Sequence, residues 1–532
     1  MLNQLRDRTF EKLNGWKFLI ILLLTIGVFL RFAHLDEKVY SADEVRSILR
    51  LSGYTSQEFI DKTYKGDIIS LEEIQKYQKP NSEKNLNDAI HALARNPEHP
   101  PLYHMITRFW MQIFNAPIEA RIASILISYL ALFGLYWLCL ELFESPIPGW
   151  IAMALFAVSP FQILAAQNTT QYSLWSGMIL LSSAALLKAL RGNNKSYWLI
   201  YAVTLALGLY THLFFTIVAF GQGIYVLIRE RLHFNKNLIA YCFSSLLGVL
   251  IFIPWILVFF SNLEKVEKNT QYYRQFKTNI NEIIKTLYSN LGNVFIDFFH
   301  TRGKLENFLH FLILMLIIYS IYFMIRNTKI KVWSFILILI LITPVVQIVP
   351  DLISQSIRSL QSRYYLPCFL GIQLAVAYLI SNRIISTSVN IWLRRFWQFI
   401  FLTLLLLGII SGIILSRTND AGLDDQRGTA SSQNLAIASV INQAKKPLVI
   451  SDTTHSFVLA LSHLLKPEAS FQLFPKNDIE QWQQKLNLSE DTQDFSDVFL
   501  YFPNDDFLNF IKQDKNFYLE SVQGKIYKIV KN

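Results

Sequence analysis

Charged residues and cysteines are both scarce in this chain. Only 17% of its 532 residues are charged, against about 25% in an average soluble domain, and this shortage argues against a purely soluble enzyme. The three cysteines, Cys139, Cys242 and Cys368, all lie within apolar stretches. They show neither a disulfide framework nor the ligand spacing of a zinc site, so we interpret them as small apolar side chains.

Hydrophobic residues are abundant instead. They make up 52% of the chain, aromatic residues alone reach 14%, and the net charge is +10. Apolar runs close to the roughly 20 residues that span a bilayer recur along most of the sequence. We therefore predict an all-α polytopic membrane protein. The positive charge belongs to the membrane part, where it indicates orientation, and we expect no nucleic-acid partner.

Eleven apolar runs are candidate membrane spans. They lie at residues 18–32, 118–142, 149–166, 172–190, 197–211, 213–228, 238–260, 305–325, 332–350, 364–381 and 396–416. The run at 102–115 is shorter and contains His104 and Arg108, which favours a helix at the membrane interface over a twelfth span.

The short connectors between these runs differ in charge. Four of them are basic, near residues 188–195, 229–236, 326–331 and 383–395, and the flank before residue 18 is basic too. Basic loops stay in the cytoplasm, so we expect a cytoplasmic N-terminus, an extracytoplasmic loop at 35–117 and an extracytoplasmic C-terminal tail. We read residues 18–32 as a retained span.

The tail differs in composition from the rest. Buried-strand patterns at 447–452, 497–502 and 524–530 alternate with helical stretches, which is typical of a small α/β domain. We predict two domains: residues 1–416, which include the loop 35–117, and residues 417–532. Within that loop, residues 71–77 form an amphipathic pattern, which we interpret as a short helix on the membrane surface.

Five polar strings fall on the predicted outer face. They are Tyr-Ser-Ala-Asp-Glu at 40–44, Glu-His-Pro-Pro-Leu-Tyr at 98–103, Gln-Asn-Thr-Thr-Gln-Tyr at 167–172, Gly-Leu-Tyr-Thr-His at 208–212 and Ser-Arg-Tyr-Tyr-Leu-Pro at 362–367. Polar and ionisable groups are costly near lipid and are often functional. Because the charge of the connectors alone places all five on one side, they predict a single cleft.

In order and spacing, these strings resemble the motifs of a known family: the polytopic lipid-phosphate-sugar-dependent glycosyltransferases of the GT-C superfamily, related to protein O-mannosyltransferases and aminoarabinose transferases. The resemblance covers about residues 17–380 and implies a GT-C fold. Because relatives of this length with a small outer tail are bacterial, it also implies a location in the inner (plasma) membrane. One string departs from it. Many relatives carry a Gln-Glu-Ala-Arg-like string where this chain has Gln167, Asn168, Thr169 and Thr170, so the identity of the substrate is not carried over.

The resemblance implies roles for several residues. Asp43 would be the base for an acceptor hydroxyl, and Glu44 would orient the acceptor or help to hold a cation. Arg363 would grip the donor phosphate. Further substrate-binding candidates are Glu98, His99, Tyr103, Gln167, Tyr172, His212 and Tyr364. No cofactor is assigned with certainty, and a divalent cation held by Glu98, His99 and His212 stays open. The plainer alternatives are a solvated helix start for Asp43 and Glu44 and a headgroup contact for Arg363.

Transfer of a sugar from a polyprenyl- or dolichyl-phosphate carrier to a hydroxyl or amine of a glycan, lipid or protein is the function we predict. A transporter or flippase of lipid-linked sugars and a non-catalytic membrane scaffold are the alternatives. A transporter would carry ionisable groups at mid-membrane and often repeated halves, and neither is evident in the sequence. The enzyme hypothesis requires Asp43 and Arg363 to flank one pocket.

Overall fold

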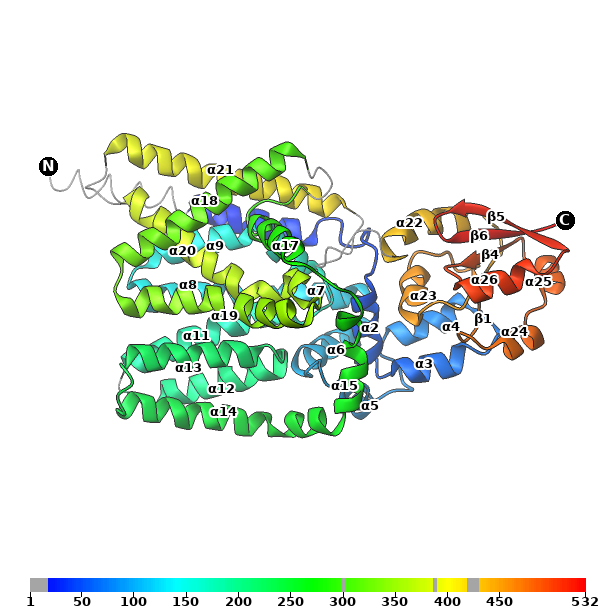
Figure 1. Cartoon of the computed structure of the whole chain (residues 1–532), viewed down its shortest axis with the longest axis horizontal. Coiled ribbons are helices and arrows are strands. Elements are labelled where there is room, and N and C mark those ends of the chain that lie inside the picture. Colours follow the sequence, from blue (N-terminus) through cyan, green and yellow to red (C-terminus); the bar gives the residue numbers. More distant parts are fainter. Residues whose placement is uncertain (1–17, 193, 299–302, 386–389, 419–429) are drawn as a thin grey trace.

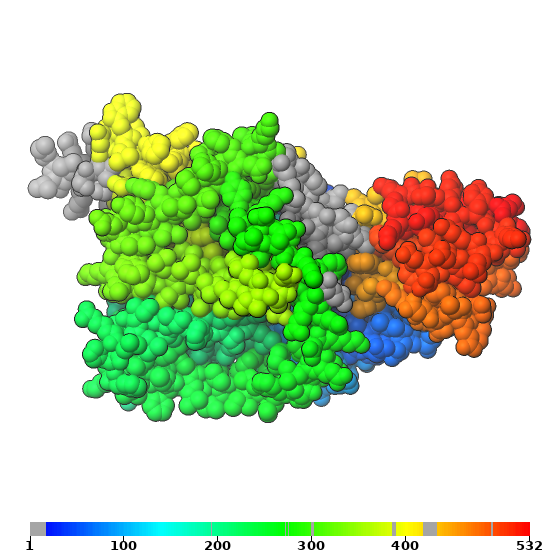
Figure 2. All heavy atoms as spheres, viewed as in Figure 1, coloured from blue at the N-terminus to red at the C-terminus, as the bar shows by residue number. Residues whose placement is uncertain are grey.

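A computed structural model describes residues 18–192, 194–298, 303–385, 390–418 and 430–532. A bundle of long helices makes up one part, and a smaller α/β unit lies at one end of that bundle (Figure 1). The α/β unit projects from the bundle as a distinct lobe (Figure 2). The helices of the first outer loop lie where the two parts meet.

Seven helical segments among the described residues are long and apolar enough to cross a membrane. They are Ile118–Phe143 (α7, Ile118–Ser128, and α8, Leu130–Phe143), α11 (Tyr172–Arg191), α14 (Lys236–Ser261), α18 (Lys304–Asn327), α19 (Ile330–Ser354), Ser362–Ile385 (η3, Ser362–Tyr365, and α20, Leu366–Ile385) and α21 (Ile391–Arg417). At 1.5 Å per residue, a helix of 20 residues reaches about 30 Å, which is the thickness of the hydrocarbon core.

The remaining predicted spans are shorter or bent. α9 (Pro146–Ala157) and α10 (Pro160–Gln167) form a pair bent by 62°, and two short apolar helices cover Phe18–Phe32 and α13 (Phe215–Arg229). α12 (Lys195–Thr211) lies between α11 and α14 in the chain. Each of the eleven predicted runs is therefore a helix or a bent pair of helices, and the polytopic all-α prediction is confirmed.

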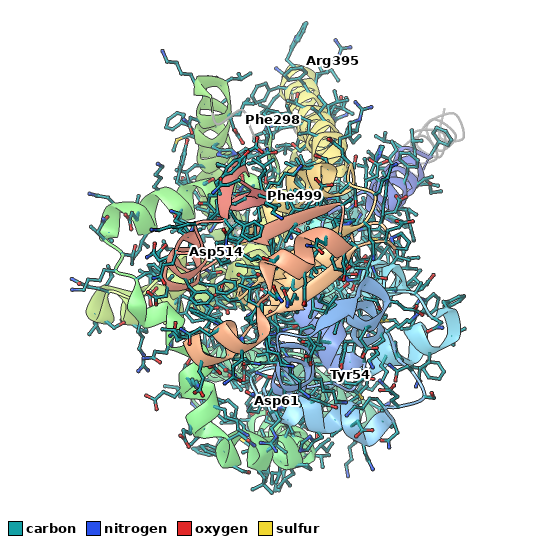
Figure 3. The ribbon with its side chains drawn as sticks, turned by 90° about the vertical axis from the view of Figure 1, so that its right-hand side faces the viewer. Tyr54, Asp61, Phe298, Arg395, Phe499 and Asp514 are labelled. Atoms are coloured by element: carbon teal, nitrogen blue, oxygen red, sulfur yellow. The ribbon has the colours of Figure 1, made fainter. Side chains whose placement is uncertain are left out.

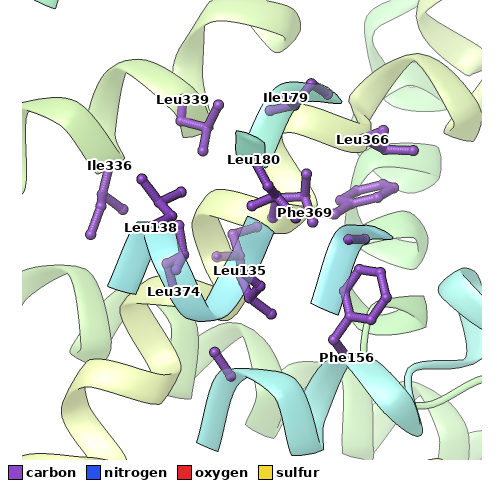
Figure 4. Close-up of a cluster of buried hydrophobic side chains, with 14 of the residues drawn as sticks. Leu135, Leu138, Phe156, Ile179, Leu180, Ile336, Leu339, Leu366, Phe369 and Leu374 are labelled. Atoms are coloured by element: carbon purple, nitrogen blue, oxygen red, sulfur yellow. The ribbon is translucent and has the colours of Figure 1, made fainter. Parts of the chain in front are cut away.

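The core of the bundle consists of aliphatic and aromatic side chains from helices far apart in the sequence. Leu135 and Leu138 of α8, Leu180 of α11 and Phe369 of α20 are fully or almost fully buried and point toward one another (Figure 4). Burial of one such side chain contributes about 2 kcal/mol. The periphery is apolar as well: Phe243 on α14 is 70% exposed, as expected for a side chain that faces lipid.

The first outer loop folds into short elements. They are α2 (Ala42–Leu51), α3 (Ser56–Thr63), β1 (Ile68–Ser70), α4 (Leu71–Gln75), η1 (Lys76–Gln78), α5 (Leu86–Ala94) and α6 (Leu102–Phe114). A second outer segment contains α15 (Leu263–Thr270), α16 (Tyr272–Gln275) and α17 (Ile280–Asn293), and η2 (Arg358–Leu360) precedes η3. α6 is amphipathic, with buried Tyr103 and Met111 on one side and exposed Phe109 and Ile113 on the other.

The α/β unit is built on a six-stranded sheet in the order β1-β3-β2-β4-β6-β5. The chain runs through α22 (Ala430–Ile441), β2 (Pro447–Ser451), α23 (His455–Ser462), β3 (Ser470–Leu473), α24 (Ile479–Lys485), α25 (Leu488–Asp494), β4 (Asp497–Tyr501), α26 (Asp505–Lys512), β5 (Phe517–Gln523) and β6 (Ile526–Lys531). β2 lies parallel between β3 and β4. All five of its residues are buried, as expected for a strand covered on both faces.

Three strands of this sheet differ from the sequence prediction. β2, β4 and β6 were expected, whereas β1, β3 and β5 were not. β1 has only three residues and pairs antiparallel with β3 across some 400 positions of sequence, for example Ile69 with Phe471. A strand of that length carries no readable alternation. β5 lies at the sheet edge and is mostly exposed, so it lacks the buried pattern of a core strand.

The first loop and the tail share one hydrophobic core. Tyr54 and Tyr77 of the loop belong to the same buried cluster as Phe471 and Phe499 of the sheet, and Figure 3 shows both sides of this contact from the outer end, with Tyr54 and Phe499 labelled. The hydroxyl of Tyr64 also donates to the carbonyl of Thr453 at 2.8 Å. The loop is therefore folded onto the α/β unit and carries α2 with it.

This packing corrects one expectation. Residues 71–77 are helical, but they do not lie on the membrane surface. Leu71 and Ile74 of α4 are buried in the cluster shared with the sheet, and the Gln75 amide donates to the carbonyl of Ser462 at 2.7 Å. An amphipathic pattern identifies an apolar face, but it does not distinguish lipid from protein as the surface that covers this face.

Candidate active site

The two acidic residues of the first string lie in the first turn of α2. Ser41 caps the helix, with a reciprocal capping box: the Ser41 side chain accepts from the Glu44 amide, and the Glu44 carboxylate accepts from the Ser41 amide at 3.0 Å. Neighbouring positions on a helix point about 100° apart. Asp43 and Glu44 therefore enter different surroundings.

Asp43 contacts two arginines. One carboxylate oxygen accepts from Arg363 at 2.5 Å and the other from Arg46 at 2.9 Å. Arg363 lies in η3 at the start of α20, some 320 positions from Asp43 in sequence, and also approaches the Tyr273 hydroxyl at 3.4 Å. We call Asp43, Arg46, Arg363 and Tyr273 the reaction cluster. The juxtaposition of Asp43 and Arg363 that the enzyme hypothesis requires is present.

The electrostatics of Asp43 follow from these contacts. Burial alone would raise the pKa of its carboxyl group, but the charges of Arg363 and Arg46 outweigh that effect and hold the pKa well below its usual range. The Asp43 side chain stays 41% exposed, whereas that of Arg363 is 12% exposed. An ionised carboxylate thus faces an accessible space beside a nearly enclosed guanidinium group.

Glu44 has the opposite environment. Its side chain is 0% exposed, and its two oxygens accept from Arg121 at 2.9 and 3.0 Å. The amide of Thr169 adds a further hydrogen bond at 3.1 Å. Arg121 also donates to the carbonyls of Leu35, Lys38 and Val39. We call Glu44, Arg121 and these partners the anchor cluster. Its hydrogen bonds are satisfied internally, which favours a positioning role for Glu44.

Aromatic side chains line one side of the reaction cluster. The Arg363 guanidinium lies 5.9 Å from the Tyr172 ring centre and 5.4 Å from that of Tyr364. His212 stacks on Trp175 at 4.4 Å and lies 5.7 Å from Tyr172. The tyrosines and the histidine predicted from three separate strings thus gather beside Arg363.

The 98–103 string lies beside the same cluster. Glu98 accepts from Asn269 of α15 at 2.9 Å, while its Oε2 atom is buried without a hydrogen-bond partner. His99 shares a hydrogen bond of 3.3 Å with Gln171. Burial, reinforced by the charge of Arg50, holds the pKa of His99 well below its usual value, so its imidazole is neutral near pH 7.

Two predicted binding residues, Tyr103 and Gln167, form hydrogen bonds outside the reaction cluster. Tyr103 is fully buried, and its hydroxyl shares a 2.5 Å hydrogen bond with that of Ser124. Gln167 donates to the carbonyls of Leu30 and Arg31 at 3.1 and 3.2 Å, which satisfies the end of the first helix. These contacts support the walls of the site.

The geometry brings Asp43, Tyr172, His212, Arg363 and Tyr364 together, with Glu98 and His99 alongside. It does not assemble a metal centre: no group of three His, Cys, Asp or Glu side chains within the described ranges could hold a metal ion. Glu98, His99 and His212 are therefore not arranged as ligands of one cation in this conformation.

Sequence reasoning missed Arg46, Arg121 and Tyr273. Arg121 interrupts the apolar run 118–142, and a charge in such a run was a signal of a functional or paired residue. Arg46 follows Asp43 by three positions, the spacing of a helical ion pair. Nothing in the sequence marks Tyr273, because its contact with Tyr364 at 3.0 Å joins two distant loops.

Comparison with known proteins gives a family match for part of the chain and a fold match for nearly all of it. Residues 98–258 match the family model described as dolichyl-phosphate-mannose-protein mannosyltransferase. Two crystal structures of ArnT from Cupriavidus metallidurans, one bound to undecaprenyl phosphate and one in the apo state, resemble the chain with TM-scores of 0.54 and 0.55. In both cases the identity is 12%, and 97% of this chain and 98% of that chain are covered. No curated protein matches the chain by sequence.

The family model confirms, over residues 98–258, the resemblance drawn from the motifs. The two structures extend the likeness in fold to nearly the whole chain, including the α/β unit.

Proposed function

We propose that this chain, which shares the fold of ArnT and matches the mannosyltransferase family model over residues 98–258, is a membrane glycosyltransferase. It takes a sugar from a polyprenyl monophosphate carrier, the class of lipid bound in one of the ArnT structures. A lipid donor requires a groove open to the bilayer, and a polar acceptor requires an aqueous approach. In this proposal the helix bundle supplies the groove, and the folded loop 35–117 borders the aqueous approach.

The observation that carries this proposal is the contact between Asp43 and Arg363. A base and a phosphate-binding cation are the two groups that such a transfer needs. They come from opposite ends of the chain's membrane part, and they meet where the carboxylate remains 41% exposed.

In the transfer, Asp43 accepts the proton of the acceptor and Arg363 stabilises the charge of the leaving phosphate. The acceptor hydroxyl attacks the anomeric carbon of the sugar, and its proton passes to the Asp43 carboxylate. The bond from the anomeric carbon to the phosphate oxygen breaks, and its electrons remain on the polyprenyl phosphate. Arg363 stabilises the negative charge that forms there. A carboxylate with a low pKa is sufficient because deprotonation can be late in an oxocarbenium-like transition state.

Donor binding also activates the base. The donor phosphate competes with Asp43 for Arg363, and Arg363 makes the largest contribution that lowers the pKa of Asp43. When Arg363 turns to the phosphate, Asp43 becomes the stronger base. In this mechanism the Asp43–Arg363 ion pair is the arrangement of the site before the donor binds.

The surrounding residues divide into two groups. Glu98, His99, Tyr172, His212 and Tyr364 contact the substrates. Tyr103, Gln167 and Glu44 hold the walls of the site, and Glu44 in particular fixes the start of α2. No metal step is part of this mechanism.

The proposed orientation of the protein rests on the basic connectors, and the proposed membrane rests on the resemblance. The site lies on the extracytoplasmic face of the inner (plasma) membrane, with the N-terminus in the cytoplasm and the C-terminus outside. In this proposal residues 1–416 are the transferase domain, and residues 417–532 form a unit with the loop 35–117 above it. The acceptor is a glycan, lipid or protein that approaches from the aqueous side.

The direct test is transfer from labelled donors. Purified full-length protein in lipid nanodiscs is incubated with polyprenyl monophosphates that carry labelled hexoses or pentoses, and the loss of label from the lipid fraction is measured. We expect label to leave at least one donor, by transfer or by slow hydrolysis. Movement of intact donor between leaflets without cleavage would instead identify a flippase. If neither cleavage nor movement occurred, the non-catalytic scaffold would be the remaining alternative.

A further inference from the structure

Arg50 is a buried arginine without a partner. Its side chain is 6% exposed, its Nε atom has no hydrogen-bond partner, and no ion pair reaches it within the described ranges of the chain. The three other arginines that are equally buried there, Arg31, Arg108 and Arg121, all donate to carbonyl or carboxylate oxygens. A guanidinium group that is 6% exposed and has no carboxylate within ion-pair distance in the described ranges can bind an anion that the protein itself does not supply.

The position of Arg50 on α2 links it to the reaction cluster. It follows Asp43 by seven residues and Arg46 by four, which places all three on one face of the helix. At 1.5 Å per residue, Arg50 lies about 10 Å along the axis from Asp43. That separation would place a second group of a bound substrate at Arg50 while its reacting hydroxyl reaches Asp43.

Charges around this face do not balance. Asp43 and Glu98 are the carboxylates that interact electrostatically with Arg50, yet neither lies within ion-pair distance of it. The three arginines Arg46, Arg50 and Arg363 therefore outnumber two carboxylates. The Oε2 atom of Glu98 is also buried without a partner. The surface thus offers an unpaired cation beside an unpaired hydrogen-bond acceptor.

The α/β unit encloses the Arg50 end of this face. α2 packs against α23, and His455 at the start of α23 is close enough to Arg46 and Arg50 to interact with their charges. Its Nε2 atom is buried without a hydrogen-bond partner as well. Arg363, in contrast, belongs to the end of a bundle helix. An anion at Arg50 is therefore best supplied by a molecule from the aqueous side.

We infer that Arg50 and Glu98 form a subsite for an acidic acceptor, in which a carboxylate or phosphate group binds Arg50 and a neighbouring hydroxyl donates to Glu98. This inference rests on the proposed function and names the class of its acceptor: an acidic saccharide, carrying either a carboxylate or a phosphate. The polyprenyl phosphate remains at Arg363. Arg50 acts in binding and takes no part in the proton transfer.

Ligand-induced thermal shifts of the full chain in nanodiscs test this subsite. The probes are glucuronate, glucose 6-phosphate, neutral glucose and undecaprenyl phosphate. For the wild type we expect stabilisation by one or both acidic sugars and none by glucose. Arg50→Gln should weaken the acidic-sugar affinity at least tenfold, Arg50→Lys should retain part of it, and both should respond to undecaprenyl phosphate as the wild type does.

Arg108→Gln is the matched control. Arg108 is equally buried, and its Nε atom also has no partner, but its two terminal nitrogens donate to the carbonyls of Leu51 and Lys84. Its loss should lower the basal Tm and leave the acidic-sugar shift intact, whereas Arg50→Gln should not lower the basal Tm, because it removes an unpaired buried charge.

Three outcomes overturn the inference: acidic sugars that stabilise the wild type and Arg50→Gln alike, a wild type that responds to neither acidic sugar, or an undecaprenyl phosphate shift that disappears in Arg50→Gln. A basal Tm that falls as far in Arg50→Gln as in Arg108→Gln would also assign Arg50 to the fold. Failure of the proposed function appears separately, as the absence of any response to undecaprenyl phosphate in the wild type.

Discussion

The anchor cluster and the reaction cluster contain adjacent residues of α2, Glu44 and Asp43, but the two carboxylates differ in exposure and in their hydrogen-bond partners. Glu44 is enclosed and saturated by Arg121 and backbone groups. Asp43 forms ion pairs with Arg46 and Arg363, and its side chain is still 41% exposed. Buried polar groups in folded proteins are almost always satisfied, so the saturated cluster is the usual product of folding. The reaction cluster combines an ion pair with a part-exposed carboxylate, which is typical of a functional site.

The largest expected difference between the clusters is in activity. Asp43→Asn keeps the shape of the side chain and removes the base, so sugar transfer should fall by about 10²–10⁴-fold. The basal Tm should change little, because the carboxylate is part-exposed and its ion pairs stabilise weakly. Initial rates of label release, measured beside thermal unfolding of the same preparation, check this prediction. A variant with wild-type turnover would remove Asp43 from the mechanism.

Glu44→Gln should produce the opposite pattern. It leaves Arg121 buried without its counter-charge, which costs about 3–5 kcal/mol. The expected signs are a lower Tm and earlier proteolysis of the first outer loop, since Arg121 also holds the carbonyls of Leu35, Lys38 and Val39. Activity should be lost only to the extent that the protein unfolds.

A double variant separates charge from packing in the anchor cluster. Glu44→Gln with Arg121→Met removes both charges and should be less destabilised than Glu44→Gln alone. If Glu44→Gln were as stable as the wild type but inactive, the division between the two clusters would be wrong and Glu44 would belong with the reacting groups.

A smaller effect concerns pH and the outer part of the molecule. Burial, with a further contribution from Arg46 and Arg50, lowers the pKa of His455 to about 4. Burial, with Arg121, lowers that of His463 to about 3. Unfolded histidines have a pKa near 6.5, so between these values the unfolded chain binds more protons. Stability should therefore fall as the pH falls below about 6.5.

Asp43 does not contribute in that range. Its folded pKa lies below the unfolded value, so its contribution is present above about pH 4 and is lost only in stronger acid. Thermal unfolding between pH 7.5 and 4.5 should show a declining Tm, with a shallower decline in His455→Gln. A Tm that stays constant or rises on acidification would contradict buried neutral histidines.

The sequence predicted best what depends on local pattern. All eleven apolar runs are helical in the structure, two of them as pairs of helices. The placement of Asp43 and Arg363 on one face follows from the basic connectors and the motif order. Both are visible without knowledge of packing. The helix at 71–77 was also predicted, although its place was not, because lipid and a neighbouring sheet select the same apolar face.

What could not be predicted depends on partners far away in the chain. The partner of Glu44 is Arg121, which lies within a predicted span, and β1 is a strand only because β3 lies beside it. Arg50 has no ion-pair partner within the described residues, and the sequence pattern alone cannot show this. The distinction between saturated and unsaturated charges therefore requires the folded structure.

The central claim is that Asp43 and Arg363 flank one bound donor and perform different tasks. Binding of undecaprenyl phosphate to the wild type, Asp43→Asn and Arg363→Gln in nanodiscs, measured in parallel with transfer, tests it most directly. We predict that Asp43→Asn binds the lipid at least as tightly as the wild type, because the phosphate no longer competes with a carboxylate for Arg363, and that its transfer falls by at least about 10²-fold. Arg363→Gln should lose binding by at least about tenfold. Equal binding by wild type and Arg363→Gln would contradict the account.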